Sequence, residues 1–153
     1  MRNKKKLMVL QLDEKMKSFR GTEKVMNPPQ GWIAVIRMSL NMTMEQLGKK
    51  LGITKGAVQK LEEREAAGRI SLNKLKAVGD ALNLHFVYGF VPIDGTLENL
   101  VDRKAKEMAR KIVFRTHYTM QLENQGIAED KINQSIIELA DELKRNMKRS
   151  LWD

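Results

Sequence analysis

The sequence predicts a mainly α-helical protein with a four-helix head, one β-strand and a long carboxyl-terminal helical hairpin. Apolar residues recur every three or four positions in residues 32–83 and again in residues 97–147, as amphipathic helices require. Between these stretches, residues 84–91 (LHFVYGFV) alternate β-branched and aromatic side chains with smaller or polar ones, which is typical of a strand.

The charge balance favours a polyanionic partner. The 153 residues include 28 Lys and Arg against 19 Asp and Glu, a net charge of +9. Nucleic acid is the commonest partner of such an excess, although a solvated basic surface has the same composition. The lack of cysteine excludes disulfides and thiolate metal sites. No apolar run is long enough for a membrane span, so we expect a cytoplasmic protein without a membrane partner.

The chain divides into three segments by composition. Residues 1–30 hold a basic arm (RNKKK), an amphipathic helix from Leu7 to Arg20 and a linker rich in glycine, asparagine and proline. Residues 31–83 form the head. Residues 84–153 hold the strand and the hairpin, which we expect to serve dimerisation or partner binding.

Residues 43–65 (TMEQLGKKLGITKGAVQKLEERE) predict two short helices joined by a tight turn. Thr43 and Thr54 are good N-cap residues, and Gly52 accepts the left-handed backbone that ends the first helix. Ile53 is expected to fill the turn from the core. The inward residues of the two flanking helices are expected to be Trp32, Ile33, Ile36 and Leu40, and Leu72, Leu75, Val78 and Leu82.

The opposite face of the second helix is polar and basic. A helix of this kind, held across a three-residue turn, has the geometry that enters a DNA major groove. We expect Lys55 and Lys60 to reach base edges, with Gln59 near a base or the backbone. The expected DNA-binding residues are Thr43, Thr54, Lys55, Gly56, Ala57, Gln59, Lys60 and Arg64. The same spacing occurs in plain helical bundles, but the agreement of spacing, capping and charge favours double-stranded DNA as the partner.

These residues resemble the helix-turn-helix of Cro-type phage repressors. The shared pattern is Thr-x-x-x-Leu-Gly-x-x-Leu-Gly-Ile-Thr followed by Val-x-x-Leu-Glu, and the resemblance covers about residues 32–83. It implies a structural ion pair between Arg37 and Glu62. It also implies a glutamine after the first N-cap, which bonds a DNA phosphate. Met44 occupies that position and cannot make the bond, so one expected DNA anchor is missing.

A solitary strand at residues 84–91 needs a partner, because its backbone N–H and C=O groups would otherwise lack hydrogen bonds. The alternatives are an N-terminal segment such as Leu7–Leu12 and the same strand of a second subunit. We favour the second subunit, which predicts a two-fold homodimer. The two hairpin helices are expected to begin at Thr96, as N-cap, and near Glu129, and their apolar stripes also need burial.

Nearly the whole chain resembles the family called mobile mystery protein A. The similar segments are LQLDEKM, GWIAVIRMSLNMT, LEEREAAGRISLNKLKAVGDALN, VYGFVP and HYTMQLENQ, in this order. Members of that family are predicted helix-turn-helix proteins found beside mobile mystery protein B, which carries a Fic domain of the kind that transfers AMP to proteins. The resemblance implies a regulator or antitoxin, and we expect a repressor of its own operon.

Residues 119–124 (TMQLEN) resemble the inhibitory helix of Fic-protein antitoxins, whose pattern is Ser/Thr-x-x-x-Glu-Gly/Asn. In that family the glutamate pairs with an arginine of the enzyme and blocks placement of the ATP γ-phosphate. The resemblance implies that Thr119, Glu123 and Asn124 contact a Fic-domain partner. So short a pattern also arises by chance in roughly one chain in ten of this length, and Asn124 with Gly126 suits an ordinary helix end.

Catalysis is not predicted. The two histidines, His85 and His117, lie far apart in the sequence, and no metal-ligand spacing, phosphate-binding glycine loop or nucleophile–base arrangement is visible. We therefore expect no catalytic residue, metal site or cofactor. Two functions stay open, a sequence-specific DNA-binding repressor and a protein-binding antitoxin.

Overall fold

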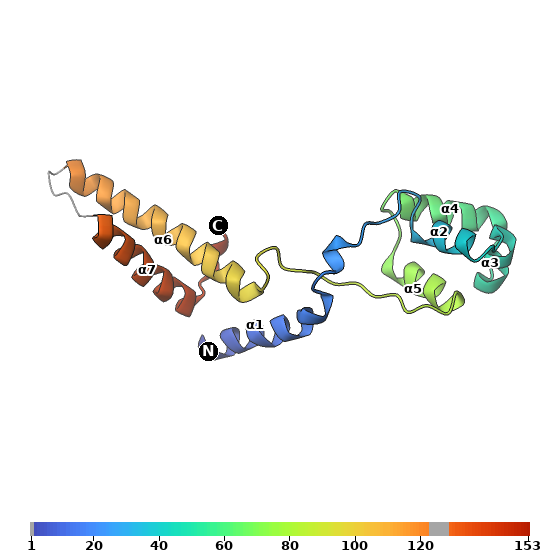
Figure 1. Cartoon of the computed structure of the whole chain (residues 1–153), viewed down its shortest axis with the longest axis horizontal. Helices are drawn as coiled ribbons and strands as arrows, with labels where there is room; N and C mark the ends of the chain where they lie inside the picture. The colour runs from blue at the N-terminus through green and yellow to red at the C-terminus, as the bar shows by residue number, and fades with distance from the viewer. Residues whose placement is uncertain (1, 123–128) are drawn as a thin grey trace. The chain divides into compact units, whose positions relative to one another are not determined.

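Seven α-helices and no β-strand are present in residues 2–122 and 129–153, which a computed structural model describes (Figure 1). The mainly helical fold class is thereby confirmed. The helices are α1 (Arg2–Met16), α2 (Trp32–Ser39), α3 (Met44–Leu51), α4 (Lys55–Ala66), α5 (Leu72–Ala81), α6 (Leu97–Leu122) and α7 (Glu129–Asn146). They belong to two compact units, which we call the head (Glu23–Gly89) and the hairpin unit (Met1–Thr22 with Phe90–Asp153).

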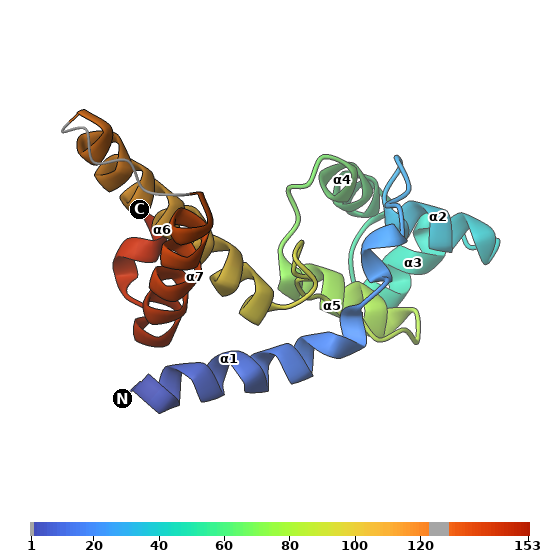
Figure 2. The same ribbon diagram turned by 60° about the vertical axis from the view of Figure 1, so that its left-hand side comes forward.

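The head consists of helices α2 to α5 (Figure 2). All four helices contribute to its buried core, which is made of Ile33, Leu47, Val58, Leu61, Val78 and Leu82. The predicted N-caps are confirmed, because Thr43 Oγ1 accepts from Gln46 N at 3.1 Å and Thr54 Oγ1 accepts from Ala57 N at 3.1 Å. Each such cap contributes about 1 kcal/mol. Gly52 ends α3 in the left-handed region, with φ 68°.

Four residues that were expected in the core lie on the surface of the head instead. Ile53 is 38% exposed, and the exposed fractions of Trp32, Leu40 and Leu72 are 41%, 58% and 49%. Trp32 and Leu72 are the first residues of their helices and Leu40 follows the last residue of α2, so each has neighbours on one side only. The indole N–H of Trp32 instead donates to Asn27 Oδ1 at 3.1 Å.

The prediction of a β-strand at residues 84–91 is wrong. These residues are irregular and pair with no strand in the described part of the chain. Phe86 and Tyr88, two positions apart, still place their side chains together, since their rings stack with the centroids 6.0 Å apart. The Leu84 N–H caps α5 by donating to Gly79 O at 2.8 Å. β-Propensity reflects packing on a sheet, and residues 2–122 and 129–153 hold no strand beside which this segment could pack.

The predicted carboxyl-terminal hairpin is present, with α6 and α7 lying side by side and antiparallel (Figures 1 and 2). Ala105 and Ala109 of α6 are fully buried, and such small side chains allow α7 to approach closely. The buried core of this unit is Ala105, Ala109, Ile132, Ile136, Ala140 and Leu151. None of the described helices is both long and apolar enough to cross a membrane.

The N-terminal segment is a helix from Arg2 onward, where the sequence predicts a basic arm before Leu7. Helix α1 is fixed to the start of α6 by one carboxylate. Asp13 Oδ1 accepts from Leu97 N at 2.7 Å, and Asp13 Oδ2 accepts from Glu98 N at 3.1 Å. Residues 1–22 therefore fold with the carboxyl-terminal hairpin, and the head is inserted between them.

Candidate nucleic-acid interface

The candidate interface is the outer face of α4, and a buried ion pair sets the orientation of this helix. Arg37 of α2 donates from Nε to Glu62 Oε1 at 2.6 Å and from Nη2 to Glu62 Oε2 at 3.3 Å. The third guanidinium nitrogen, Nη1, donates to Met42 O at 3.0 Å. The exposed fractions of Arg37 and Glu62 are 9% and 6%. A bidentate pair of this kind fixes both the distance and the rotation of α4 relative to α2.

A second link joins the same two helices one turn further along. Gly31 stands at the N-cap of α2 and has no side chain to accept a hydrogen bond. Glu65 of α4 replaces it, since its Oε1 accepts from Ile33 N at 2.8 Å. Sequence reasoning missed this role of Glu65. The available signal was the glycine at a helix start, which indicates that a capping group comes from elsewhere in the chain.

The turn between α3 and α4 is held by close backbone contact. A Cβ added at Gly48 would lie 2.6 Å from Ile53 O, so no larger residue fits there without movement of the turn. The start of α3 is held by a capping box, in which Gln46 Oε1 also accepts from Thr43 N at 2.9 Å. The pattern Thr-x-x-Gln signals this box in the sequence, but Gln46 was missed.

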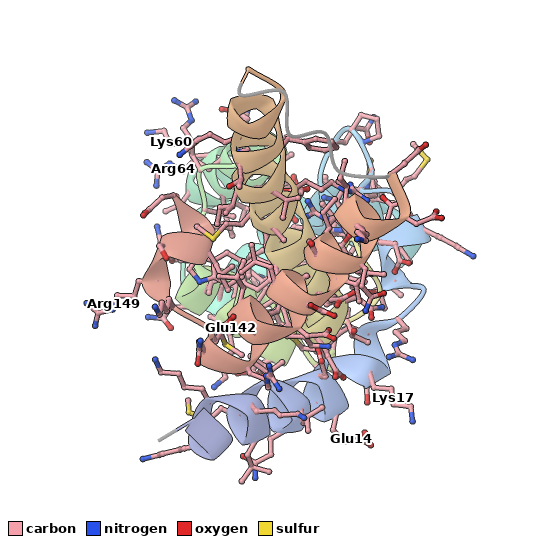
Figure 3. The ribbon with its side chains drawn as sticks, turned by 90° about the vertical axis from the view of Figure 1, so that its left-hand side faces the viewer. Glu14, Lys17, Lys60, Arg64, Glu142 and Arg149 are labelled. Carbon is pink, nitrogen blue, oxygen red and sulfur yellow. The ribbon has the colours of Figure 1, made fainter. Side chains whose placement is uncertain are left out.

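Most of the residues expected to bind DNA are exposed on one side of the head. Lys55, Gly56, Gln59 and Lys60 are exposed on α4, whereas Ala57 is half-buried. Arg64 is exposed one turn after Lys60, and Figure 3 shows the charged ends of both side chains directed away from the helix. The structure therefore brings most of the expected DNA-binding residues onto one accessible face.

The two capping threonines are exposed at the N-termini of α3 and α4. Their oxygen atoms accept from backbone N–H groups, and each hydroxyl hydrogen is left to donate to a phosphate oxygen. Met44, the residue that departs from the Cro-type pattern, is half-buried against the core of the head. It supports packing at the position where the resemblance implies a phosphate contact.

Glu63 adds a carboxylate to the outer face of α4. Gln59 Nε2 donates to Glu63 Oε1 at 3.4 Å, and both side chains are exposed. This contact holds the Gln59 amide along the helix and leaves its carbonyl oxygen as an acceptor. Arg64, the next residue along α4, is exposed as well.

The residues implied by the Fic-antitoxin resemblance are not tested by the structure. Thr119 lies within the bounds of α6, whereas Glu123 and Asn124 lie outside the described residues. Of the two histidines, His85 is exposed in the head. Among the described residues, no group of three His, Asp or Glu side chains could hold a metal ion.

Comparison with known proteins agrees with the geometry of the head. Residues 33–88 match the family model described as Helix-turn-helix, which spans all four helices of the head and the irregular segment after α5. No curated protein and no solved structure shows significant similarity to the chain. A domain of this type indicates a DNA-binding regulator. Residues 33–88 of this chain are therefore a helix-turn-helix domain of the Cro/C1 type.

Proposed function

We propose that the chain is a sequence-specific DNA-binding repressor whose helix α4 enters the major groove. The observation that carries the proposal is the outer face of α4, where Lys55 and Lys60 are exposed around Gly56 while Arg37 and Glu62 fix the helix from behind. A rigid helix with an accessible basic face satisfies the geometric requirement for reading base edges.

Each part of this face has a separate task. The ammonium groups of Lys55 and Lys60 donate to guanine O6 and N7, which are acceptors in the major groove. Gly56 has no atom within 4 Å of a Cβ built on it, so its backbone lies at the open surface and allows close approach. The N-termini of α3 and α4, with Thr43 and Thr54, supply N–H and hydroxyl donors for phosphates.

We further propose that the functional form is a homodimer. One recognition helix reads only one half-site, so a second copy is needed to read the other half of the operator. A two-fold dimer would place two copies of α4 about 34 Å apart, one turn of DNA, and would require a palindromic operator. Binding upstream of its own gene would then repress its own operon.

A titration of the full chain against the duplex that precedes its own gene tests this function. Fluorescence anisotropy gives the dissociation constants for that duplex and for a random duplex of equal length at one salt concentration. We expect the upstream duplex to bind at least about 1,000-fold more tightly, and footprinting to show two protected half-sites one turn apart. Equal affinity for both duplexes would show that the protein is not a sequence-specific repressor.

An antitoxin-like role belongs to the same proposal, with a Fic-domain protein encoded alongside as the partner. Its support is the resemblance of residues 119–124 to the Fic-inhibitory pattern. Co-expression with the neighbouring gene product, followed by co-purification and an AMP-transfer assay, tests it. If the Glu123→Gly variant inhibits AMP transfer as well as the parent chain does, the resemblance is accidental.

A further inference from the structure

Helix α1 carries apolar side chains around its whole circumference. Val9 and Met16 are half-buried on the side that also carries Asp13. The other large apolar residues of the helix are exposed, and the exposed fractions are 53% for Leu7, 59% for Met8, 42% for Leu10 and 46% for Leu12. Large apolar side chains that stay exposed among the charged residues of a folded unit mark a candidate interaction surface. The hairpin unit covers α1 on one side only.

The exposed side of α1 cannot simply turn inward. Both oxygens of Asp13 are engaged by the first two N–H groups of α6, which fixes the rotation of α1. A rotation that buried Leu7 and Met8 would break both hydrogen bonds and leave the N–H groups of Leu97 and Glu98 without this acceptor, although Thr96 Oγ1 would still accept from Asn99 N. The apolar surface is therefore a fixed feature of the folded unit.

The charges of α1 are arranged so that the helix complements itself. Lys4, Leu7, Gln11 and Glu14 follow one another in steps of three, four and three residues, which places them on one strip of the helix. The strip is basic at its start and acidic at its end. Figure 3 shows Glu14 extending away from the ribbon of α1.

We infer that α1 is an interaction surface for a second copy of this chain, and that the two α1 helices pair antiparallel. In this arrangement Lys4 lies opposite Glu14 of the second copy, and Leu7 lies opposite Gln11 of the second copy. Met8 flanks the strip close to the two-fold axis, where it meets its own counterpart, whereas Leu10 on the other flank lines the pocket between α1 and the hairpin helices. The contact is isologous, as a closed dimer requires.

The helix dipole supplies an independent reason for antiparallel pairing. Lys4, Lys5 and Lys6 lie near the start of α1, and no acidic residue is present in its first turn. Cations near a helix N-terminus oppose the positive end of the dipole. In an antiparallel pair, Glu14 of the second copy would lie near this end of α1 and would offset both the charge of the lysines and the positive end of the dipole. An anionic membrane surface would also attract the lysines, but it would repel Glu14 and leave the acidic end uncompensated.

This inference rests on the homodimer proposed above and places its interface in α1. The first test is sedimentation equilibrium of the full chain with reversed charges. Lys4→Glu and Glu14→Lys each turn two attractive contacts into repulsive ones, so each should weaken dimerisation about tenfold or more. The combined Lys4→Glu and Glu14→Lys variant should recover the affinity of the parent. Leu7→Lys should also weaken dimerisation, whereas Ile137→Lys, a matched change at an exposed position of α7, should leave it unchanged.

Single cysteines give a second readout, because the natural chain has none. In the antiparallel pair, two copies of Met8→Cys are separated by only about 3 Å along the axis and should be joined by a short bifunctional thiol reagent. Two copies of Lys4→Cys are separated by about 15 Å along the axis and should not, whereas a mixture of Lys4→Cys and Glu14→Cys should cross-link.

The outcomes separate the interface from the function. The antiparallel α1 interface is overturned, but the homodimer is not, if the dimer affinity is unchanged by Lys4→Glu, Glu14→Lys and Leu7→Lys. Equal cross-linking of Lys4→Cys and Met8→Cys would have the same meaning. A monomer mass at micromolar concentration overturns both. Binding of the Leu7→Lys variant to a single half-site reports on the DNA-binding function alone, and it should equal that of the parent chain.

Discussion

The buried pair between Arg37 and Glu62 gives the sharpest prediction for the head. Replacing Glu62 by glutamine keeps the size of the side chain but removes its charge. The guanidinium of Arg37, which is 9% exposed, then lies beside a neutral amide, and Met42 O at 3.0 Å is its other acceptor. Breaking one side of a buried pair costs about 3–5 kcal/mol, because an uncompensated charge is left in the interior.

This loss is large compared with the stability of so small a unit, which at roughly 0.05–0.15 kcal/mol per residue is on the order of 3–10 kcal/mol. The double change Arg37→Met and Glu62→Leu removes both charges and fills a similar volume. It should cost far less than Glu62→Gln, since apolar replacements of buried pairs are often neutral. DNA affinity of the double variant should nevertheless fall, because α4 loses the contact that sets its orientation.

The assay is urea unfolding of the full chain followed by tryptophan fluorescence. A Trp152→Phe background leaves Trp32 as the only tryptophan, so the signal reports the head alone. The reasoning fails if Glu62→Gln lowers the free energy of unfolding of the head by less than about 1 kcal/mol, or if the apolar pair is as destabilising as the single change.

Four further predictions concern single positions. Gly56→Ala should raise the free energy of unfolding of the head by about 0.5–1 kcal/mol and weaken DNA binding; urea unfolding measures the first effect and an anisotropy titration the second. Gly48→Ala should lower the free energy of unfolding of the head, because its Cβ would lie 2.6 Å from the backbone oxygen of Ile53. Asp13→Asn should cost about 1 kcal/mol and speed hydrogen exchange of the first amides of α6, and unchanged exchange there would count against the cap. The hydrogen bond from Arg103 lowers the pKa of Glu107. The stabilisation by this ion pair is therefore present at neutral pH and is lost as the pH falls through the lowered pKa of Glu107. Arg103→Gln should raise the pKa of Glu107 in a carboxyl-carbon NMR titration, and an unchanged pKa would refute the assignment.

The local features of the head could be predicted from the sequence because each depends on neighbouring residues. Thr43 and Thr54 cap their helices, and Gly52 ends α3, through contacts that span three or four positions. The pairing of Arg37 with Glu62 is a long-range contact, and only the resemblance to Cro-type repressors pointed to it. The exposed position of Ile53 could not be predicted, since its apolar side chain gives no indication of how the turn faces solvent.

The errors in the other parts of the chain have physical causes of the same kind. Residues 84–91 have the side chains of a strand, but a strand forms only where another backbone supplies hydrogen bonds. Residues 2–6 are strongly basic and suggest a flexible arm, whereas they extend α1. The bond that fixes α1 joins Asp13 to Leu97, and neither residue type carries a signal of a contact across so much sequence.

The central claim is that the outer face of α4 reads DNA bases, and a matched pair of double variants tests it most directly. Lys55→Ala with Lys60→Ala removes two cations from α4, and Arg110→Ala with Lys111→Ala removes two exposed cations from α6. Dissociation constants for the upstream and random duplexes are measured for both at one salt concentration. We predict that the α4 variant loses on the order of 1–3 kcal/mol of discrimination for each lysine, whereas the α6 variant keeps its discrimination. If both variants weaken binding to the two duplexes by the same factor, base reading by α4 is contradicted.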